Sequence, residues 1–95
     1  MVPQLAEVRR GAALLDKMQP GWAKQINTTT LEMGSSCDCI LGQLYGDYID
    51  GAKAIGLCSI YQRIHYGFST CGKWSDLDRL WKSEVTTMVG IKDVG

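Results

Sequence analysis

Residues 37–57 read CDCILGQLYGDYIDGAKAIGL, and we interpret the rest of the chain around this segment. It combines a pair of cysteines, separated by one residue, with a long run of apolar side chains at helical spacing. Ser36 or Asp38 can cap the start of a helix here, and Gly56 can end it. We therefore predict one central helix with the cysteine pair at its start. Its apolar side consists of Ile40, Leu41, Leu44, Tyr48, Ile49, Ala52 and Ile55.

Two more segments show apolar residues at spacings of three and four, which is the pattern of an amphipathic helix. The first ends where Gln19-Pro20-Gly21 interrupts the pattern. Gly11 lies within this segment, and its missing side chain indicates a close approach by another element. The second begins after Ser75 and ends before Gly90. The apolar positions are Leu5, Val8, Ala12, Leu15 and Met18 in the first segment, and Leu77, Leu80, Trp81, Val85 and Met88 in the second.

Shorter apolar patterns predict two additional helices, over residues 20–26 and 60–65. Ser59 can cap the second of these. Its inward-facing residues are expected to be Ile60, Tyr61 and Ile64. Residues 28–33 are rich in β-branched side chains and could pair with residues 68–70. The predicted fold class is mainly α, a small domain of three main and two short helices, and a minimal two-stranded β ribbon would make it α+β.

The composition is that of a small globular domain. The chain has 95 residues, of which 45% are hydrophobic and 21% are charged. A chain of this length corresponds to one domain, so residues 1–95 are predicted to form a single globular unit. The sequence contains no internal repeat and no low-complexity segment, so it offers no sign of a further division.

The charge pattern argues against binding to nucleic acid. Ten basic and ten acidic residues cancel, and they are interspersed along the chain rather than grouped in runs of one sign. A protein that binds a duplex needs clustered Lys and Arg side chains to displace counterions from the phosphates. Nucleic acid is therefore not an expected partner. The alternative is that the protein binds nucleic acid because folding brings basic residues together on one face: Lys53, Arg63, His65 and Lys73.

No stretch of apolar residues is long enough to cross a bilayer, and the N-terminus lacks the basic and apolar regions of a signal peptide. We therefore expect no contact with a membrane, and a cytoplasmic location with reduced thiols. In that compartment the Asn27-Thr28-Thr29 sequon is a loop or a helix cap rather than a glycosylation site.

The cysteines are the sharpest candidates for chemistry. The ligand types of a structural zinc site are present in Cys37, Cys39, Cys58, Cys71 and His65. Their spacing differs from paired C-x-x-C knuckles, which are the strong signature of such a site. We therefore favour no metal and no cofactor. The alternative is a zinc-stabilised domain that could contact nucleic acid. In the favoured interpretation Cys58 and Cys71 are small buried apolar side chains.

Catalysis by a cysteine or the histidine has less support. Cys37 and Cys39 would gain thiolate character at a helix N-terminus, but Asp38 between them opposes it. The single histidine, His65, could act as the base for a cysteine nucleophile. No local signature of a known catalytic family accompanies it. These residues therefore predict no enzymatic activity.

Asp47 and Asp50 form a further pair of ionisable side chains. They are three positions apart on the predicted central helix and could share a proton or bind a metal ion. Lys53 follows Asp50 by the same interval. We therefore favour a solvent-exposed face of opposite charges.

Large aromatic side chains are the best candidates for a binding surface. The chain has three Trp and four Tyr residues. Most of them should lie in the core, but Trp and Tyr also dominate the energetics of protein interfaces. Trp74 lies between a loop and a helix cap, and Tyr45 and Tyr48 lie on the predicted central helix. These three residues are the predicted interaction site.

Several short motifs are distinctive as a set. They are Arg10–Asp16 (RGAALLD), Pro20–Trp22 (PGW), Cys39–Gly46 (CILGQLYG), Gly56-Leu57 and Tyr66–Phe68 (YGF). The set resembles a group of small, functionally uncharacterised proteins of phages that infect actinobacteria, mycobacteriophages among them. The resemblance covers most of the chain, and its most specific part begins at Cys39. Cys39 belongs to the group's pattern more clearly than Cys58 or Cys71, which argues against a shared four-ligand zinc site.

The resemblance implies a context rather than a mechanism. Small accessory phage proteins often act in the host cytoplasm by binding another protein. The predicted function is therefore a non-enzymatic phage accessory protein that binds a host or phage protein. The identity of the partner, the stage of infection and the oligomeric state are left open by the sequence.

Overall fold

The computed structural model describes residues 4–70 and 72–94, with side chains as far as residue 90. Cys71, a member of the alternative zinc set, lies outside the described residues. The described part forms five α-helices, one 3-10 helix and no strand. The elements are α1 (Leu5–Met18), η1 (Trp22–Gln25), α2 (Ile40–Tyr45), α3 (Tyr48–Ala54), α4 (Ile60–His65) and α5 (Trp74–Val94). The mainly α prediction is confirmed, and the two segments considered for a β ribbon consist of turns and irregular backbone.

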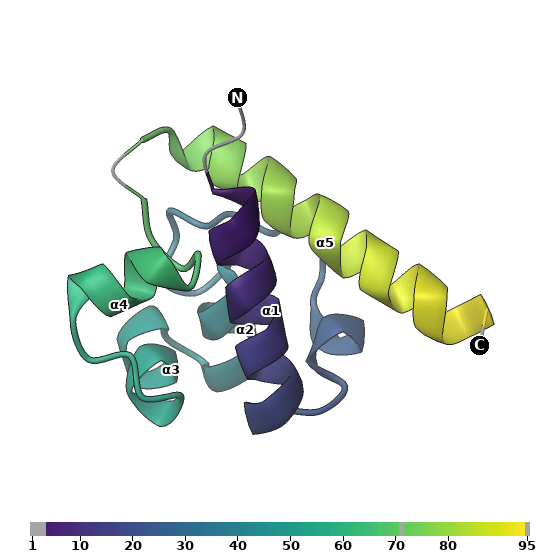
Figure 1. Cartoon of the computed structure of the whole chain (residues 1–95), viewed down its shortest axis with the longest axis horizontal. Coiled ribbons are helices and arrows are strands. Elements are labelled where there is room, and N and C mark those ends of the chain that lie inside the picture. Colours follow the sequence, from purple (N-terminus) through teal and green to yellow (C-terminus); the bar gives the residue numbers. More distant parts are fainter. Residues whose placement is uncertain (1–3, 71, 95) are drawn as a thin grey trace.

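The helices are arranged on both sides of α1 (Figure 1). α5, the longest helix, crosses one side of the molecule, and α1 packs against it. α2, α3 and α4 lie on the other side, with α3 packed on α2 and α4 packed on α1. η1 contacts both α5 and α2. This arrangement places α3 and α4 at one end of the molecule and the C-terminal end of α5 at the other.

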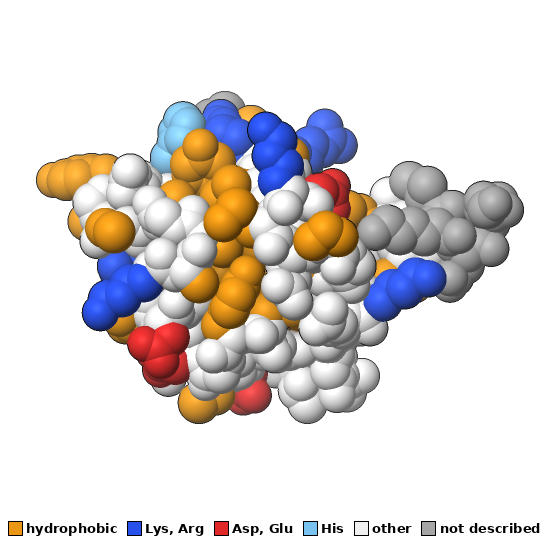
Figure 2. Space-filling view, turned by 90° about the horizontal axis from the view of Figure 1, so that it is seen from below, with side chains coloured by type: hydrophobic (Ala, Val, Ile, Leu, Met, Phe, Trp, Pro, Cys, Tyr) orange, Lys and Arg blue, Asp and Glu red, His pale blue; other side chains and the backbone are white. Residues whose placement is uncertain are grey.

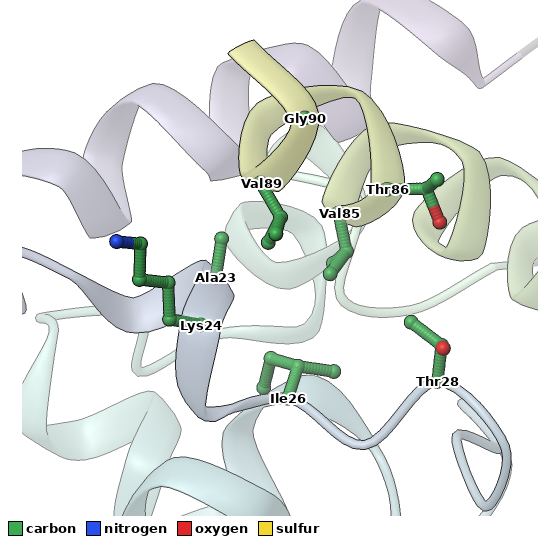
Figure 3. A pocket seen from close by; sticks show the side chains of 8 residues that line it. All are labelled: Ala23, Lys24, Ile26, Thr28, Val85, Thr86, Val89 and Gly90. Carbon is green, nitrogen blue, oxygen red and sulfur yellow. The ribbon is translucent and has the colours of Figure 1, made fainter. Parts of the chain in front are cut away.

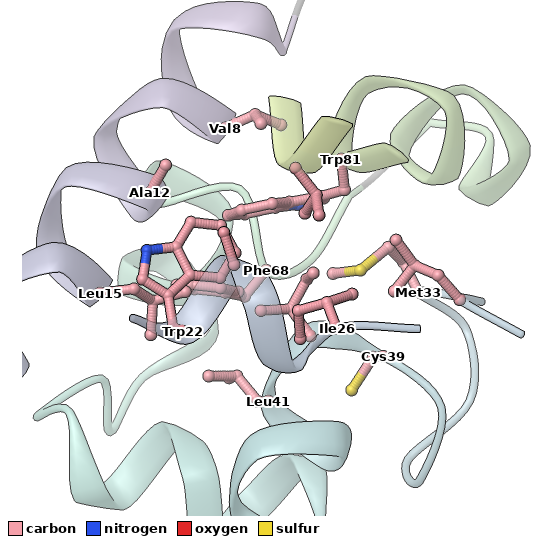
Figure 4. Packing of buried hydrophobic residues seen from close by; sticks show 14 of the residues in the cluster. Val8, Ala12, Leu15, Trp22, Ile26, Met33, Cys39, Leu41, Phe68 and Trp81 are labelled. Atoms are coloured by element: carbon pink, nitrogen blue, oxygen red, sulfur yellow. The ribbon is translucent and has the colours of Figure 1, made fainter. Parts of the chain in front are cut away.

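Trp81 of α5 lies at the centre of the core (Figure 4). Its ring stacks on Phe68 with 5.2 Å between centroids, and it meets Trp22 edge-on at 5.9 Å. Its indole Nε1 donates a hydrogen bond of 2.6 Å to the carbonyl oxygen of Gly67. Trp81 therefore buries a large apolar area without leaving its polar group unpaired. The other large, fully buried side chains include Val8, Leu15, Ile40, Leu41 and Leu77.

The close approach predicted at Gly11 is confirmed. A Cβ atom at this position would overlap the carbonyl oxygen of Tyr66 and would lie 3.1 Å from the indole of Trp81. Glycine is therefore what lets α1 contact both α5 and the segment that follows α4. Of the predicted stripe on α1, Val8, Ala12 and Leu15 are buried, whereas Met18 at the helix end is exposed.

The single central helix is a wrong prediction, because two helices, α2 and α3, occupy its place. Gly46 ends α2 with a φ angle of +92°, in the left-handed region that glycine adopts without strain. Asp47 then caps α3: its carboxylate accepts hydrogen bonds from the backbone N–H groups of Ile49 and Asp50. Consecutive stop and start signals therefore override a continuous apolar pattern.

Cys39, rather than Ser36 or Asp38, caps α2. Its sulfur accepts a hydrogen bond of 3.2 Å from the backbone N–H of Gly42. The Cys39 side chain is fully buried in the core, among the apolar residues of Figure 4. The cysteine pair is thus divided, because Cys37 is exposed and lies before the cap.

Candidate protein-binding surface

The three described cysteines differ in exposure. Cys37 is exposed and Cys39 is buried. Cys58 is exposed, so the prediction that it is a small buried apolar side chain was wrong. Burial raises the pKa of the Cys39 thiol, and the hydrogen bond from the Gly42 N–H offsets this only in part. Cys39 is therefore held in the protonated form at neutral pH, which suits a helix cap and not a nucleophile.

The described residues, which leave out Cys71, include no group of three or more His, Cys, Asp or Glu side chains that could hold a metal ion. Asp47 and Asp50 were predicted to lie on one helix, but only Asp50 lies within α3. Asp47 is the cap of α3 and not part of the helix, and its carboxylate accepts the hydrogen bonds of that cap. Its role in the fold is therefore structural.

A groove of about 450 Å³ lies between η1 and the C-terminal half of α5 (Figure 3). Figure 3 shows Val85 and Val89 directed toward Ala23 and Ile26, while the Lys24 side chain extends away from them. Lys24 is the one ionisable side chain among the eight that line the groove, so this set offers no acid–base pair. The lining residues are Ala23, Lys24, Ile26, Thr28, Val85, Thr86, Val89 and Gly90.

The structure separates Trp74 from the other two predicted interaction residues. Trp74 begins α5 and is 40% exposed, with one side of its ring against Gly34. Tyr45 and Tyr48 belong to α2 and α3, near the opposite side of the molecule in Figure 1, and both are partly buried against the core. Burial raises the pKa of the Tyr48 hydroxyl, while the nearby Arg63 guanidinium, 5.5 Å from the ring centroid, lowers it in part. Trp74 therefore remains accessible, and Tyr48 is mainly a packing residue.

The most exposed large apolar side chains on one element are on α4. Tyr61 is 81% exposed and Ile60 is 47% exposed. The prediction that both face inward was wrong, and α4 has no buried residue at all. Tyr61 and His65 are four positions apart, so they lie on the same side of the helix, and both are exposed. We call Ile60, Tyr61 and His65 the α4 surface.

Hydrogen bonds hold the N-terminal turn of α4 in place. Ser59 and Gln62 form a capping box, in which each side chain accepts a hydrogen bond from the other residue's backbone N–H. Arg63 donates from Nε to the carbonyl oxygen of Leu57 and from Nη2 to that of Cys58, each at 3.1 Å. The turn that carries Ile60 and Tyr61 is thus fixed from both sides.

The C-terminal end of α4 is fixed as well. Arg10 of α1 donates a hydrogen bond from Nη1 to the carbonyl oxygen of His65 at 3.0 Å. Gly67 has a φ angle of +77°, and its N–H donates a hydrogen bond to the carbonyl oxygen of Ile64. The N–H of Phe68 donates to the carbonyl oxygen of Arg63 at 2.8 Å. Tyr61 is therefore exposed on a helix anchored at both ends.

Figure 2 shows the whole molecule from below. Hydrophobic side chains protrude at the left, where α3 and α4 lie in Figure 1, and the histidine lies beside Lys and Arg side chains. An anchored element with a protruding aromatic side chain is typical of a protein-binding surface, because little backbone entropy remains to be lost on binding.

The sequence contained one usable signal for this surface. The capping box places Ile60 and Tyr61 in the first two positions of a helix of six residues. Fewer than two turns do not define an inward face by periodicity. The orientation of α4 is decided instead by the hydrogen bonds of Arg10 and Arg63. Arg10 is distant from α4 in sequence, and the acceptors of Arg63 lie before the helix begins.

Comparison with protein-family models, curated proteins and solved structures found no match. In the described part of the chain, no helix combines the length and apolar character needed to cross a membrane.

Proposed function

We propose that this protein is a non-enzymatic accessory protein of a phage, and that it acts in the host cytoplasm by binding a host or phage protein through the α4 surface. The observation that carries the proposal is the 81% exposure of Tyr61 on a helix fixed at both ends. A tyrosine in this position contributes nothing to the core, whereas Tyr is among the residue types that contribute most at interfaces.

The expected energetic effect sets the scale of the test. Burying an exposed aromatic side chain at the centre of an interface contributes about 2 kcal/mol, which corresponds to roughly thirtyfold in the dissociation constant. Because the side chain is largely outside the fold, its removal should leave the free energy of unfolding nearly unchanged. Binding and stability are therefore separable at this position.

The experiment begins with capture of a partner from an actinobacterial host lysate, followed by measurement of its affinity for purified variants. Tyr61→Ala should weaken binding by at least about tenfold, or 1.4 kcal/mol. Met18→Ala is the matched control, because Met18 is also a large exposed apolar residue but ends α1. Equal affinities of the wild type and Tyr61→Ala would contradict the proposal.

Trp74→Ala tests the other exposed aromatic side chain in the same assay. A loss of affinity in this variant alone would assign binding to the N-terminal end of α5, as the sequence predicted. A loss in Tyr61→Ala alone would assign it to α4. The two surfaces are on different elements, so one experiment distinguishes them.

A further inference from the structure

The charge around α4 differs from that of the whole chain. The protein has ten basic and ten acidic residues, yet residues 51–75 contain no Asp or Glu. The basic side chains in that range are Lys53, Arg63 and Lys73, and the range also contains the histidine His65. Folding does not bring all four together: Lys73 precedes α5 at the top of Figure 1, whereas Lys53 belongs to α3 near the bottom.

Folding adds a different cation to α4. The Arg10 guanidinium lies at the C-terminal end of the helix because its Nη1 donates to the His65 carbonyl oxygen at 3.0 Å. Arg10 comes from α1, 55 positions away in sequence. α4 therefore has Arg63 within it, His65 at its last position and Arg10 beside that position. No acidic residue lies on the helix itself.

The acidic residues of the neighbouring helices offset this charge only in part. Asp47 and Asp50 are the acidic residues on the α3 side, and Asp50 is followed three positions later by Lys53. On α1, Glu7 lies about one turn before Arg10, and Arg9 adds a further basic residue. The named residues of α4 and its neighbouring helices thus carry an excess of one positive charge, in a chain whose formal net charge is zero; four are basic (Arg9, Arg10, Lys53, Arg63) and three are acidic (Glu7, Asp47, Asp50).

Aromatic and aliphatic side chains accompany these cations. His65 meets Tyr66 edge-on with 5.2 Å between ring centroids, and Tyr61 lies one turn before His65. Ile60 adds an exposed aliphatic group at the start of the helix. A ligand for this surface needs an anionic group for Arg10 and His65, together with an apolar group for Tyr61 and Ile60.

We propose that the α4 surface binds an acidic segment of the partner protein, in which carboxylate side chains alternate with apolar ones. This inference rests on the proposed function and specifies the chemistry of its partner. The carboxylates meet the Arg10 guanidinium, which suits them geometrically, and the imidazole of His65. The apolar side chains cover Tyr61 and Ile60.

Charge complementarity favours an acidic protein over a nucleic acid. Binding to a phosphate backbone draws on many cations along a groove and becomes steeply dependent on salt. Two arginines, Arg10 and Arg63, and one histidine, His65, lie on or beside α4. Two nitrogens of Arg63 already donate to backbone carbonyl groups. This set suits one or two carboxylates next to an apolar contact.

The test uses the full-length protein and three fluorescent probes at neutral pH. The first probe is a short peptide with the repeat Glu-Leu-Asp-Phe, the second has Lys in place of each acidic residue, and the third is an oligothymidylate of similar length. The acidic peptide should bind at least about tenfold more tightly than the basic peptide. Backbone NMR signals of residues 59–67 should shift on its addition.

Two variants that each introduce a carboxylate locate the site. His65→Glu keeps the backbone carbonyl group that accepts the hydrogen bond from Arg10. This variant should lower the affinity for the acidic peptide by at least about fivefold. Lys24→Glu also introduces a carboxylate, at a residue on η1 outside the α4 surface, and should change affinity by less than about twofold. Thermal unfolding of both variants establishes that each is folded.

Three results would overturn the inference: equal affinity for the acidic and basic peptides, preferential binding of the oligothymidylate, or no effect of His65→Glu. Failure of the inference is distinguishable from failure of the proposed function. If Tyr61→Ala weakens binding of the captured partner but the acidic peptide does not bind, α4 remains the proposed interface. The inference that its ligand is an acidic segment is then wrong.

Discussion

The Arg10 guanidinium of α1 donates a hydrogen bond to the backbone carbonyl oxygen of His65, the last residue of α4. This contact joins the first helix to a helix that has no buried residue of its own. It satisfies one of the carbonyl groups that a helix end leaves unpaired and places positive charge at the negative end of the helix dipole. It also places a cation at the α4 surface.

Loss of this contact should loosen α4. Arg10→Ala is expected to lower the free energy of unfolding by about 1 kcal/mol, because a hydrogen bond from a charged group is lost at a partly exposed site. Hydrogen exchange at residues 64–68 should accelerate more than elsewhere. Arg9→Ala removes an exposed neighbouring arginine and should leave both quantities unchanged. Equal effects of the two substitutions would contradict the role given to Arg10.

Gly11 should not tolerate a methyl group. Gly11→Ala is expected to destabilise the protein by about 2 kcal/mol, since the added Cβ overlaps the Tyr66 carbonyl oxygen and presses on Trp81. This cost exceeds the roughly 1 kcal/mol that Ala gains over Gly inside a helix. Gly90→Ala is the matched control in α5, where a Cβ has no neighbour within 4 Å, and it should stabilise slightly. Urea unfolding of both variants provides the comparison.

The break between α2 and α3 depends on a helix cap. Asp47→Ala should cost about 1 kcal/mol of stability, because the N–H groups of Ile49 and Asp50 lose their acceptor. Asp47→Asn should cost much less, since Asn caps a helix about as well as Asp. An equally large loss in both variants would mean that the charge of Asp47, and not its cap, is important.

The Cys39 thiol makes stability depend on pH at the alkaline end. Its folded pKa is raised by burial above the ordinary value of 9.0, so the folded state favours the protonated thiol. The resulting stability is fully present below about pH 9 and is lost as the pH rises through the folded pKa. Cys39→Ser keeps a cap and should flatten this loss, leaving the contribution of Tyr48, whose pKa is also raised. Urea unfolding across the alkaline range measures the difference.

The three described cysteines should differ in their rates of alkylation. Cys37 and Cys58 are exposed, so iodoacetamide should modify both in the native protein, whereas Cys39 should react only after unfolding. Peptide mass spectrometry after native and denaturing alkylation gives the three rates. Rapid native modification of Cys39 would contradict its buried role as a cap.

The sequence predicted the parts of the fold that repeat over several turns. α1 and α5 extend over 14 and 21 residues, which is long enough for their apolar stripes to establish both the helix and its inward face. Trp81 and Leu15 were placed correctly in the core for this reason. The close approach at Gly11 was also predicted, because the glycine interrupts an otherwise strong helix.

Short elements were harder to predict because single residues decide them. The Gly46-Asp47 pair ends one helix and begins the next within a continuous apolar pattern. α4 is only six residues long, and its orientation is decided by Arg10 and Arg63 contacts that no local pattern contains. Tyr61 was therefore assigned to the core, and Trp74 alone among the predicted interaction residues proved to be clearly exposed.

Site-specific photo-crosslinking in actinobacterial cells tests the proposed binding through α4 most directly. A photoreactive phenylalanine derivative is placed at position 61, and in separate samples at positions 18 and 74, which are also exposed. We predict a discrete crosslinked product with one protein from position 61 and none from position 18. A product from position 74 alone, or the same products from all three positions, would contradict binding through α4.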